Sequence, residues 1–317
     1  MRFLKKSRQA EGWLALTQLP QAEPGWQAAV VARPATATDM PQVKLAAHFP
    51  GIASTDALER MGRDLRAAQF RCSTMLAAGD YQMLSLDAPA VPPEELKTAV
   101  RWMLKDMLDY HVDDATIDVL AVPADKLPGQ RGNNMFAVAA RNSLIEARQK
   151  LFAAAKIPLS VIDVPEMAQR NIAALLEAPG RGLALLSLGA EGGLLTITHE
   201  GELVLARRLE VPLADLLEPD QERRLAAFDK LTLLLQRSLD NCERQFHAVT
   251  LSRLVLAPST VAGLDEYLGR NLYTPVNALD LADVFDLAEA PQLQDAAVQQ
   301  QFFLTLGAAL RHEEVVL

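Results

Sequence analysis

The stretch GLALLSLGAEGGLLTITHEGELVLARRL, residues 182–209, decides the fold class of this chain. It contains three apolar runs of strand length, at residues 183–188, 193–199 and 202–209. The turns between them carry glycine, which is typical of tight hairpin connections. The pattern predicts three consecutive strands joined by hairpins at the start of the second half of the chain.

Downstream of these strands, the pattern alternates between helix and strand. Residues 221–244 place apolar side chains at helical spacing, which predicts a long amphipathic helix. The elements predicted after it are a buried strand at 251–256, a helix at 259–268 closed by Gly269, a short strand at 275–276 and a terminal helix at 302–311.

Upstream, the same mixture of strands and helices occurs. Residues 12–19 and 26–32 predict a first hairpin, and residues 73–76 and 81–86 predict a second one across the turn at 77–80. Four helices are also predicted, at 55–68, from Pro92 onward, at 143–155 and at about 163–176. The third of them follows a capping box formed by Ser143 and Glu146. Three further strands are predicted at 116–122, 135–139 and 159–162. We place a domain boundary at 178–182, where Pro and Gly cluster.

This order predicts an α/β protein in which helices lie on the faces of mixed sheets. Both halves open with a glycine-punctuated hairpin of strands, which suggests a duplicated architecture without repeated residues.

Composition excludes several classes of protein. The net charge is -9 over 317 residues, so the chain offers no basic stripe for nucleic acid. Its two cysteines, Cys72 and Cys242, have neither the number nor the spacing for a disulfide framework or a cysteine zinc site, and they favour a reducing cytosol. No apolar run approaches the length that a membrane span requires.

The N-terminus is basic, with Arg2, Lys5, Lys6 and Arg8. No apolar segment follows, so it does not have the pattern of a secretory signal. We favour a solvated terminus over an electrostatic contact with anionic lipid, and both interpretations stay open.

Five stretches of the chain resemble the PilM family, the actin-like assembly proteins of type IV pilus systems. They include LSLGAE at 186–191, similar to a phosphate hairpin of the family, and LLQRSLD at 234–240, similar to its RSLD helix. The full set is 94–108, 136–142, 161–175, 186–208, and 234–240 with 254–263. Within the family the chain is most similar to the MshI proteins of the mannose-sensitive haemagglutinin (MSHA) pilus.

The resemblance implies a two-lobed actin/Hsp70-like fold, also called the ASKHA fold, in which each lobe is a mixed sheet flanked by helices. It places the first lobe at residues 1–180 with a small inserted subdomain at about 70–140. The second lobe is expected at 181–295, and a terminal helix, 296–317, is expected to pack back on the first lobe.

The resemblance also implies a nucleotide site, which we expect to be vestigial. The residues that correspond to it are Ser187, Gly189, Ala190, Glu191, Gly192, Gly193, Arg237 and Gly263. We expect either no cofactor or weak binding of ATP or ADP with magnesium, and we expect no resident metal.

Four departures from the family pattern lead to this expectation. Residues 12–18 contain no carboxylate, and Ser187 stands where the second hairpin should offer Asp. Serine cannot hold a magnesium-bound water with a full charge. Ala257-Pro258 replaces paired glycines, and Leu235 occupies a helix position that is commonly acidic. We therefore predict that hydrolysis is absent and that nucleotide binding is weak or lost.

Three local patterns allow a second interpretation. The turn 189–193 could hold an anion on its backbone N–H groups, but we favour a plain hairpin turn. The loop 109–114 (DYHVDD) could imitate a metal loop, but we favour solvated loop residues. For Met103, Leu104, Met107 and Leu108 we favour core packing over an interaction surface. Ser187 lacks the GxSxG context of a hydrolase nucleophile.

By resemblance, the chain is expected to be a cytoplasmic scaffold at the inner face of the bacterial inner membrane. It would bind the cytoplasmic tail of a PilN-like single-span protein, MshJ-like in this pilus, and associate with the membrane only peripherally. One alternative is an active ATPase of the same fold that gates the platform, with Glu191 replacing the missing Asp. Another is the cytoplasmic lobe of a GspL-like protein of type II secretion, which usually continues into a membrane span.

Overall fold

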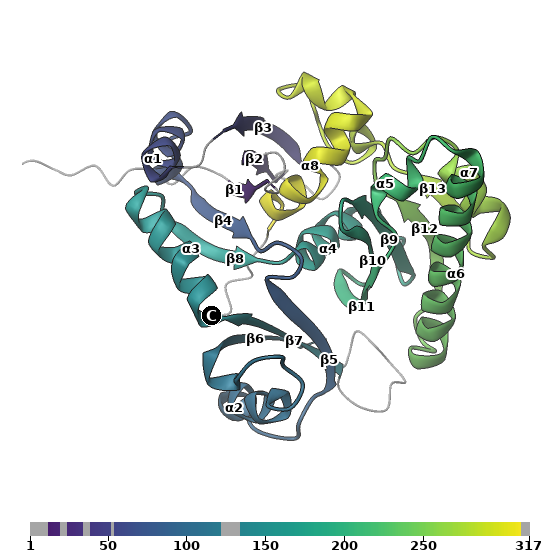
Figure 1. Cartoon of the computed structure of the whole chain (residues 1–317), viewed down its shortest axis with the longest axis horizontal. Coiled ribbons are helices and arrows are strands. Elements are labelled where there is room, and N and C mark those ends of the chain that lie inside the picture. The colour runs from purple at the N-terminus through teal and green to yellow at the C-terminus, as the bar shows by residue number, and fades with distance from the viewer. Residues whose placement is uncertain (1–11, 20–23, 34–38, 52–53, 122–133, 312–317) are drawn as a thin grey trace, which may run out of the picture. The chain divides into compact units, whose positions relative to one another are not determined.

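The computed structural model describes residues 12–19, 24–33, 39–51, 54–121 and 134–311 (Figure 1). The chain divides into two compact units. Unit 1 comprises residues 1–76, 147–172 and 280–317, and unit 2 comprises 77–146 and 173–279. These units are defined by compactness, whereas the lobes predicted above are defined by family resemblance. The predicted lobes at 1–180 and 181–295 and the predicted terminal segment at 296–317 therefore stay a prediction. The basic N-terminal residues lie outside the described residues.

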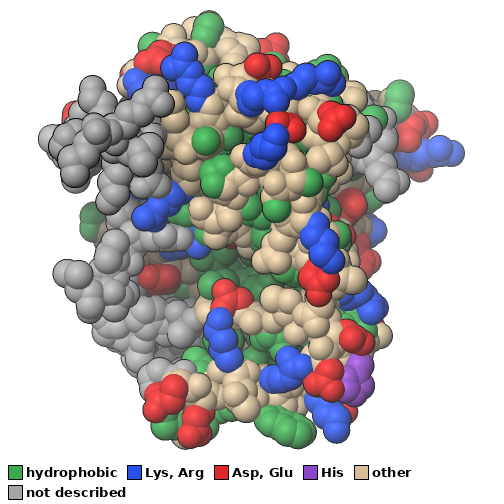
Figure 2. Space-filling view, turned by 90° about the vertical axis from the view of Figure 1, so that its left-hand side faces the viewer, with side chains coloured by type: hydrophobic (Ala, Val, Ile, Leu, Met, Phe, Trp, Pro, Cys, Tyr) green, Lys and Arg blue, Asp and Glu red, His purple; other side chains and the backbone are tan. Residues whose placement is uncertain are grey.

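Charges of both signs occur on the face of the molecule that Figure 2 shows. On the face shown in Figure 2, acidic and basic side chains alternate among hydrophobic ones, and no broad basic stripe runs across it.

Unit 1 contains a five-stranded mixed sheet with the order β3-β2-β1-β4-β8. The first three strands pair antiparallel, whereas β4 runs parallel to both β1 and β8. The strands are β1 (Trp13–Gln18), β2 (Gly25–Ala32), β3 (Gln42–Pro50), β4 (Arg71–Met75) and β8 (Leu159–Asp163). The sequence predicts each of them except β3, whose burial alternates irregularly because it is an edge strand.

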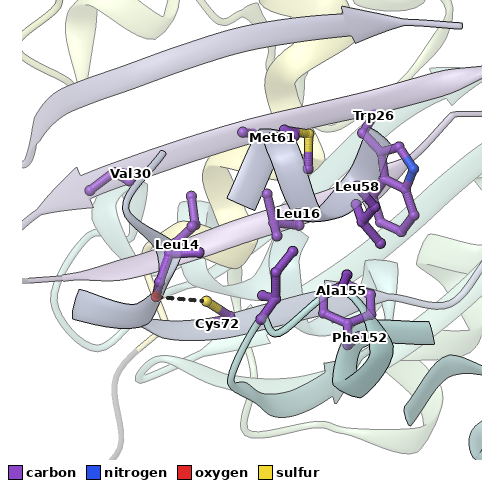
Figure 3. Packing of buried hydrophobic residues seen from close by; sticks show 12 residues of the cluster. Leu14, Leu16, Trp26, Val30, Leu58, Met61, Cys72, Phe152 and Ala155 are labelled. Carbon is purple, nitrogen blue, oxygen red and sulfur yellow. Dashed lines mark hydrogen bonds between the residues drawn. The ribbon is translucent and has the colours of Figure 1, made fainter. Parts of the chain in front are cut away.

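One face of this sheet packs against α1 (Thr55–Asp64), the turn η1 (Ala67–Gln69) and α3 (Asn142–Ala154). Figure 3 shows the resulting core, in which the Trp26 and Phe152 rings meet edge to face with centroids 5.7 Å apart. The side chain of Ser54 accepts a hydrogen bond from the Ala57 N–H and caps α1. Burial raises the pKa of Cys72 in this core to about 12.

The terminal helix α8 (Ala296–Ala309) packs on the sheet of unit 1 at β1 and β2. Its contacts include a buried hydrogen bond of 3.0 Å from Thr305 Oγ1 to Gln27 Oε1. The helix also crosses α4 (Pro165–Leu176), where a Cβ atom on Gly307 would lie 2.2 Å from the Ala168 carbonyl oxygen. Glycine is therefore required for this close approach of two backbones. Two short turns precede α8: η4 (Leu281–Asp283) and η5 (Pro291–Gln294).

Unit 2 contains two sheets. The smaller is antiparallel with the order β5-β7-β6, formed by β5 (Tyr81–Asp87), β6 (Ala115–Ala121) and β7 (Asn134–Arg141). Helix α2 (Pro93–Leu104) packs Val100 and Leu104 against it, and the turn η2 (Val112–Asp114) leads into β6. The prediction that Met103 and Met107 belong to this core is wrong, because their side chains are exposed.

The larger sheet of unit 2 has the order β11-β10-β9-β12-β13. Its strands are β9 (Gly182–Gly189), β10 (Gly192–His199), β11 (Glu202–Leu209), β12 (Leu251–Leu256) and β13 (Val276–Ala278). The first three pair antiparallel, and β12 runs parallel to β9 and β13. The helices of this part are α5 (Leu213–Leu216), α6 (Gln221–Gln245) and α7 (Leu264–Asn271).

The two five-stranded sheets share one plan. In each, three consecutive antiparallel strands are followed by two strands that run parallel to the first. The predicted duplication is thus confirmed at the level of strand order and direction.

Three further local predictions are wrong. Strands β4 and β5 do not form a hairpin, because β4 inserts between β1 and β8 while β5 pairs with β7. Helix α7 begins at Leu264 rather than at residue 259, because Gly263 adopts a left-handed φ of 74° and the Ser259 hydroxyl holds a turn before it. Helix α3 begins at Asn142, so Ser143 lies inside the helix and does not cap it.

Candidate functional site

Six of the eight residues predicted as a vestigial nucleotide site, Ser187 and residues 189–193, lie in β9, in β10 or in the turn between them, in the larger sheet of unit 2. Because β9 and β12 are parallel, their carboxyl ends lie at the same sheet edge. The Ala257 N–H donates to the Leu186 carbonyl over 2.8 Å, which brings Ala257-Pro258 beside Ser187 and Gly189. This edge is the place where parallel α/β sheets usually bind ligands.

The glycine turn connects β9 to β10 across Ala190 and Glu191. Gly189 pairs with Gly192, and both turn residues between them are exposed. Gly192 has a φ of 126°, and a Cβ atom there would lie 2.3 Å from the Leu209 carbonyl oxygen of β11. The sheet itself therefore requires glycine at this position, which supports the hairpin-turn interpretation. Gly193 is buried and has an ordinary φ.

Gly263 lies at the start of α7, with open space next to its α-carbon. The first turn of α7 carries Asp265 and Glu266. Acidic side chains at a helix N-terminus interact favourably with the helix dipole, and they repel a phosphate at the same place. This helix start is therefore poorly suited to an anionic ligand.

Arg237 is exposed on α6 and lies apart from Gly263. Helices α6 and α7 run side by side, because the Tyr267 hydroxyl donates to Asp229 over 2.5 Å and Gln236 Nε2 donates to the Asn271 carbonyl over 3.0 Å. The bond to Asp229 raises the pKa of Tyr267. Arg237 is thus level with the last turn of α7, whereas Gly263 precedes the first turn of α7. At 1.5 Å per residue, the two residues are separated by about 12 Å along the axis of α7.

Leu235 does not lie at any surface site, because its side chain is fully buried in the core. Among the predicted site residues, Glu191 alone carries a carboxylate, and it is exposed. No group of three or more His, Cys, Asp or Glu side chains with the arrangement of a metal site occurs within the described residues. Glu191 is therefore the one side chain among these predicted residues that could offer carboxylate oxygens to magnesium.

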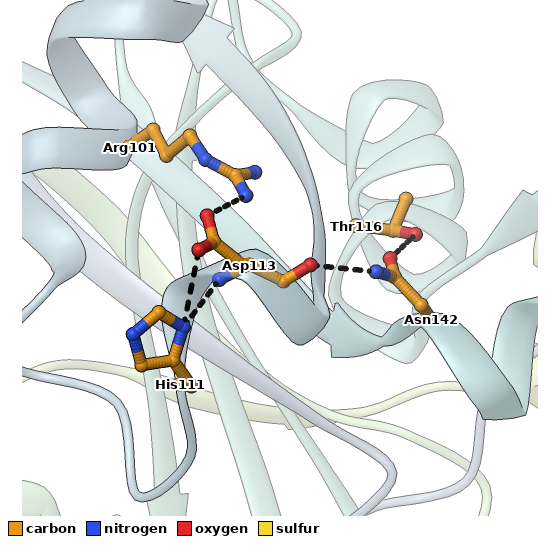
Figure 4. Close-up of polar contacts among 5 residues, drawn as sticks. All are labelled: Arg101, His111, Asp113, Thr116 and Asn142. Carbon is orange, nitrogen blue, oxygen red and sulfur yellow. Dashed lines mark hydrogen bonds and ion pairs between the residues drawn. The ribbon is translucent and has the colours of Figure 1, made fainter.

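The second candidate, the loop 109–114, is held by contacts within unit 2 (Figure 4). Arg101 Nη2 donates to Asp113 Oδ1 over 2.8 Å, and this bond lowers the pKa of Asp113. The Asn142 side-chain amide donates to the Asp113 carbonyl over 3.0 Å and accepts from Thr116 Oγ1 over 2.7 Å. These contacts support the interpretation of the loop as a surface connection tied to α2 and α3.

His111 also belongs to this group. Its Nδ1 accepts a hydrogen bond from the Asp113 N–H over 3.2 Å and lies 3.4 Å from Asp113 Oδ2. His111 serves as a local cap of η2.

The comparisons with known proteins agree with this fold. Residues 56–211, just under half of the 317-residue chain, match the family model of the type IV pilus assembly protein PilM. A chain of the solved PilM-PilN type IV pilus biogenesis complex is similar at 20% identity with a TM-score of 0.71, covering 96% of this chain and 98% of that chain.

Two further structures share the fold at lower similarity. The cytoplasmic domain of EpsL, an inner membrane component of the type II secretion system of Vibrio cholerae, is 15% identical with a TM-score of 0.51, covering 97% of this chain and 98% of that chain. A Bacteroides thetaiotaomicron protein with an actin-like ATPase fold and unknown function is 12% identical with a TM-score of 0.50, covering 93% and 99%.

No curated protein sequence matches the chain. Among the helices of the described residues, none combines the length and the apolar composition that a membrane span requires. Residues 56–211 are thus similar to the type IV pilus assembly protein PilM, and the chain has the actin-like ATPase fold.

Proposed function

We propose that this chain is a PilM-like scaffold of a type IV pilus assembly platform that binds the cytoplasmic tail of a PilN-like inner-membrane protein. The match of residues 56–211 to the PilM family model carries the proposal. The fold likeness to a chain of the PilM-PilN complex, over nearly the full length of both chains, supports it. In its finer form the proposal assigns the chain to an MSHA-type pilus as an MshI-like protein with an MshJ-like partner, located at the cytoplasmic face of the inner membrane.

We further propose that the scaffold works without nucleotide hydrolysis. Three observations at the edge of the larger sheet support this. The lone carboxylate of the predicted site, on Glu191, is exposed, and the space beside Gly192 is taken by the backbone of β11. The start of α7 already carries Asp265 and Glu266.

The competing possibility is an ATPase of the same fold, in which Glu191 holds magnesium and nucleotide binding controls the partner. A thermal-shift assay with Mg-ATP separates the two. We expect no protection by Mg-ATP in the parent protein. Protection in the parent that is lost in Glu191→Ala, and retained in the control Glu243→Ala at an exposed position of α6, would show nucleotide binding through Glu191 and support the ATPase alternative.

A GspL-like role in type II secretion is the second candidate, because the cytoplasmic domain of EpsL shares the fold. The family match favours the pilus role over it. Tagged protein incubated with detergent-solubilised membranes of its own bacterium should retain a single-span pilus platform protein, identified by mass spectrometry. Recovery of a secretion-platform protein instead would favour the GspL-like role, and recovery of no membrane protein would count against both.

A further inference from the structure

The outward face of α2 and the turn that follows it carry an exposed apolar cluster, formed by Trp102, Met103 and Met107. Their exposed fractions are 70%, 38% and 47%, whereas Trp13 and Trp26 are at most 7% exposed. On the opposite face of the helix, Val100 and Leu104 are fully buried against the small sheet. The cluster is therefore not a part of the core.

No internal partner accounts for the exposure of Trp102. The one ring contact in the described part of unit 2 that involves it is Lys105 Nζ at 6.0 Å from the ring centroid, at the outer limit of a cation–π interaction. An aromatic ring left in water loses the free energy that burial would supply, and contiguous exposed apolar side chains commonly mark interaction sites. In Figure 2, hydrophobic side chains are exposed among charged ones at the lower end, the level of α2 in Figure 1.

The charges around the cluster are not balanced. The basic side chains Lys97 and Arg101 are each 2.8 Å from an aspartate oxygen, on Asp118 and Asp113 respectively. These pairs leave Lys105, next to Trp102, as the one basic side chain of residues 93–107 that takes part in no ion pair within the described residues. Figure 4 shows the Arg101 pair.

The acidic side chains of α2 remain exposed. Within the described part of the chain, Glu94, Glu95 and Asp106 take part in no ion pair. Glu95 lies two helical turns before Trp102 and so shares its face, and Asp106 lies in the turn that directly follows the helix. The apolar cluster thus has a carboxylate at each end.

We propose that this face of α2 docks a basic amphipathic segment of another protein. The apolar side of that segment would cover Trp102, Met103 and Met107, while its Lys or Arg side chains would lie next to Glu95 and Asp106. Charge complementarity selects this occupant. An anionic lipid surface or the same face of a second copy of the chain would bring negative charge against negative charge. The proposal does not depend on the pilus assignment.

The test uses a 14-residue helical peptide of Leu and Lys, and a matched peptide in which Glu replaces every Lys. Neither peptide contains an aromatic residue, and the exposed tryptophan emission of this protein comes from Trp102. The Lys peptide should shift that emission to shorter wavelength and protect it from acrylamide. The Glu peptide should do neither.

Variants then localise the binding by fluorescence anisotropy of labelled Lys peptide. Trp102→Ala should weaken binding at least tenfold, and so should Asp106→Lys combined with Glu95→Lys. The controls are Leu233→Ala, which truncates an apolar side chain 46% exposed on α6, and Glu243→Lys, which reverses an exposed charge on the same helix. Both controls should stay within twofold of the parent, and far-ultraviolet circular dichroism confirms that each variant is folded.

Four results would overturn the proposal. They are unchanged affinity in Trp102→Ala, equal binding of the Glu peptide, an emission shift with vesicles of phosphatidylglycerol but not with the Lys peptide, and self-association in analytical ultracentrifugation that Trp102→Ala abolishes. The last two would assign the face to a membrane or to a second copy of the chain.

Discussion

Gly307 provides a sharp test of how α8 is held on unit 1. A Cβ atom on this residue would lie 2.2 Å from the carbonyl oxygen and 2.7 Å from the carbonyl carbon of Ala168. Asn171 Nδ2 donates to the Gly307 carbonyl over 2.9 Å at the same crossing. The substitution Gly307→Ala therefore forces α8 away from α4, because backbone atoms cannot rotate aside as a side chain can.

The magnitude follows from three contributions. Overpacking costs roughly 1–3 kcal/mol, and a weakened hydrogen bond from Asn171 adds about 1 kcal/mol. The better helix propensity of Ala returns up to about 1 kcal/mol. The net loss is about 1–3 kcal/mol, which corresponds to a fall in Tm of roughly 3–10 °C.

Gly269 supplies the matched control, since it is also a glycine inside a helix. It is exposed in α7, its φ is ordinary, and an added Cβ atom would come no closer than 4.0 Å to Val276. Gly269→Ala should therefore raise the stability by up to about 1 kcal/mol. Urea unfolding followed by circular dichroism measures both variants. A Gly307→Ala protein as stable as the parent would refute the packing described for α8.

Three other predictions concern charged groups and thiols. Arg311→Leu removes the ion-pair partner that lies 2.7 Å from the buried Asp163 carboxylate, and it should lower the free energy of unfolding by roughly 3 kcal/mol. Arg63→Leu, at an exposed ion pair, should lower it by less than about 1 kcal/mol in the same urea assay. Equal losses would contradict the burial of the first pair. Because burial raises the pKa of both cysteines to about 12, neither should react with a thiol reagent at pH 8 until urea unfolds the protein, and rapid labelling of the native protein would contradict this. Arg101→Ala should raise the pKa of Asp113 toward its usual value, because the hydrogen bond from Arg101 lowers that pKa in the folded state. Any stability from this pair is therefore present at neutral pH and is lost as the pH falls. A carbon-13 NMR titration that found the same pKa in both proteins would exclude this bond as the cause.

The sequence predicts those parts of the fold whose partners are close in the chain. Strands β9, β10 and β11 pair in chain order across two short turns, so apolar runs and glycines suffice to place them. The same is true of α6, whose Asp220 side chain accepts a hydrogen bond from the Arg223 N–H at the predicted start.

Partners that are distant in the chain escape such signals. The turn at 77–80 resembles a hairpin turn, but β4 is almost wholly buried and finds parallel partners in β1 and β8 instead. Periodicity alone also could not assign Met103 and Met107, because it does not show that Val100 and Leu104 are the side chains that pack on the small sheet. The exposed Trp102 beside them is the signal that the sequence interpretation missed.

The candidate site also has parts that the local sequence predicts and parts that depend on residues distant in the chain. The turn 189–193 follows from its glycines, and the need for Gly192 follows from the carbonyl of Leu209, which lies 17 residues further along the chain. Resemblance grouped Arg237 with Gly263, but the contacts between α6 and α7 place them at different levels.

The most direct test of the scaffold proposal is the affinity for the cytoplasmic tail of the captured membrane protein, measured with and without Mg-ATP. A labelled synthetic tail peptide and the full chain suffice for fluorescence anisotropy, with the same tail in scrambled order as control. We expect micromolar or tighter binding whose Kd changes by less than twofold on addition of Mg-ATP. Binding that appears only with Mg-ATP, or a tenfold change in Kd, would contradict a nucleotide-independent scaffold.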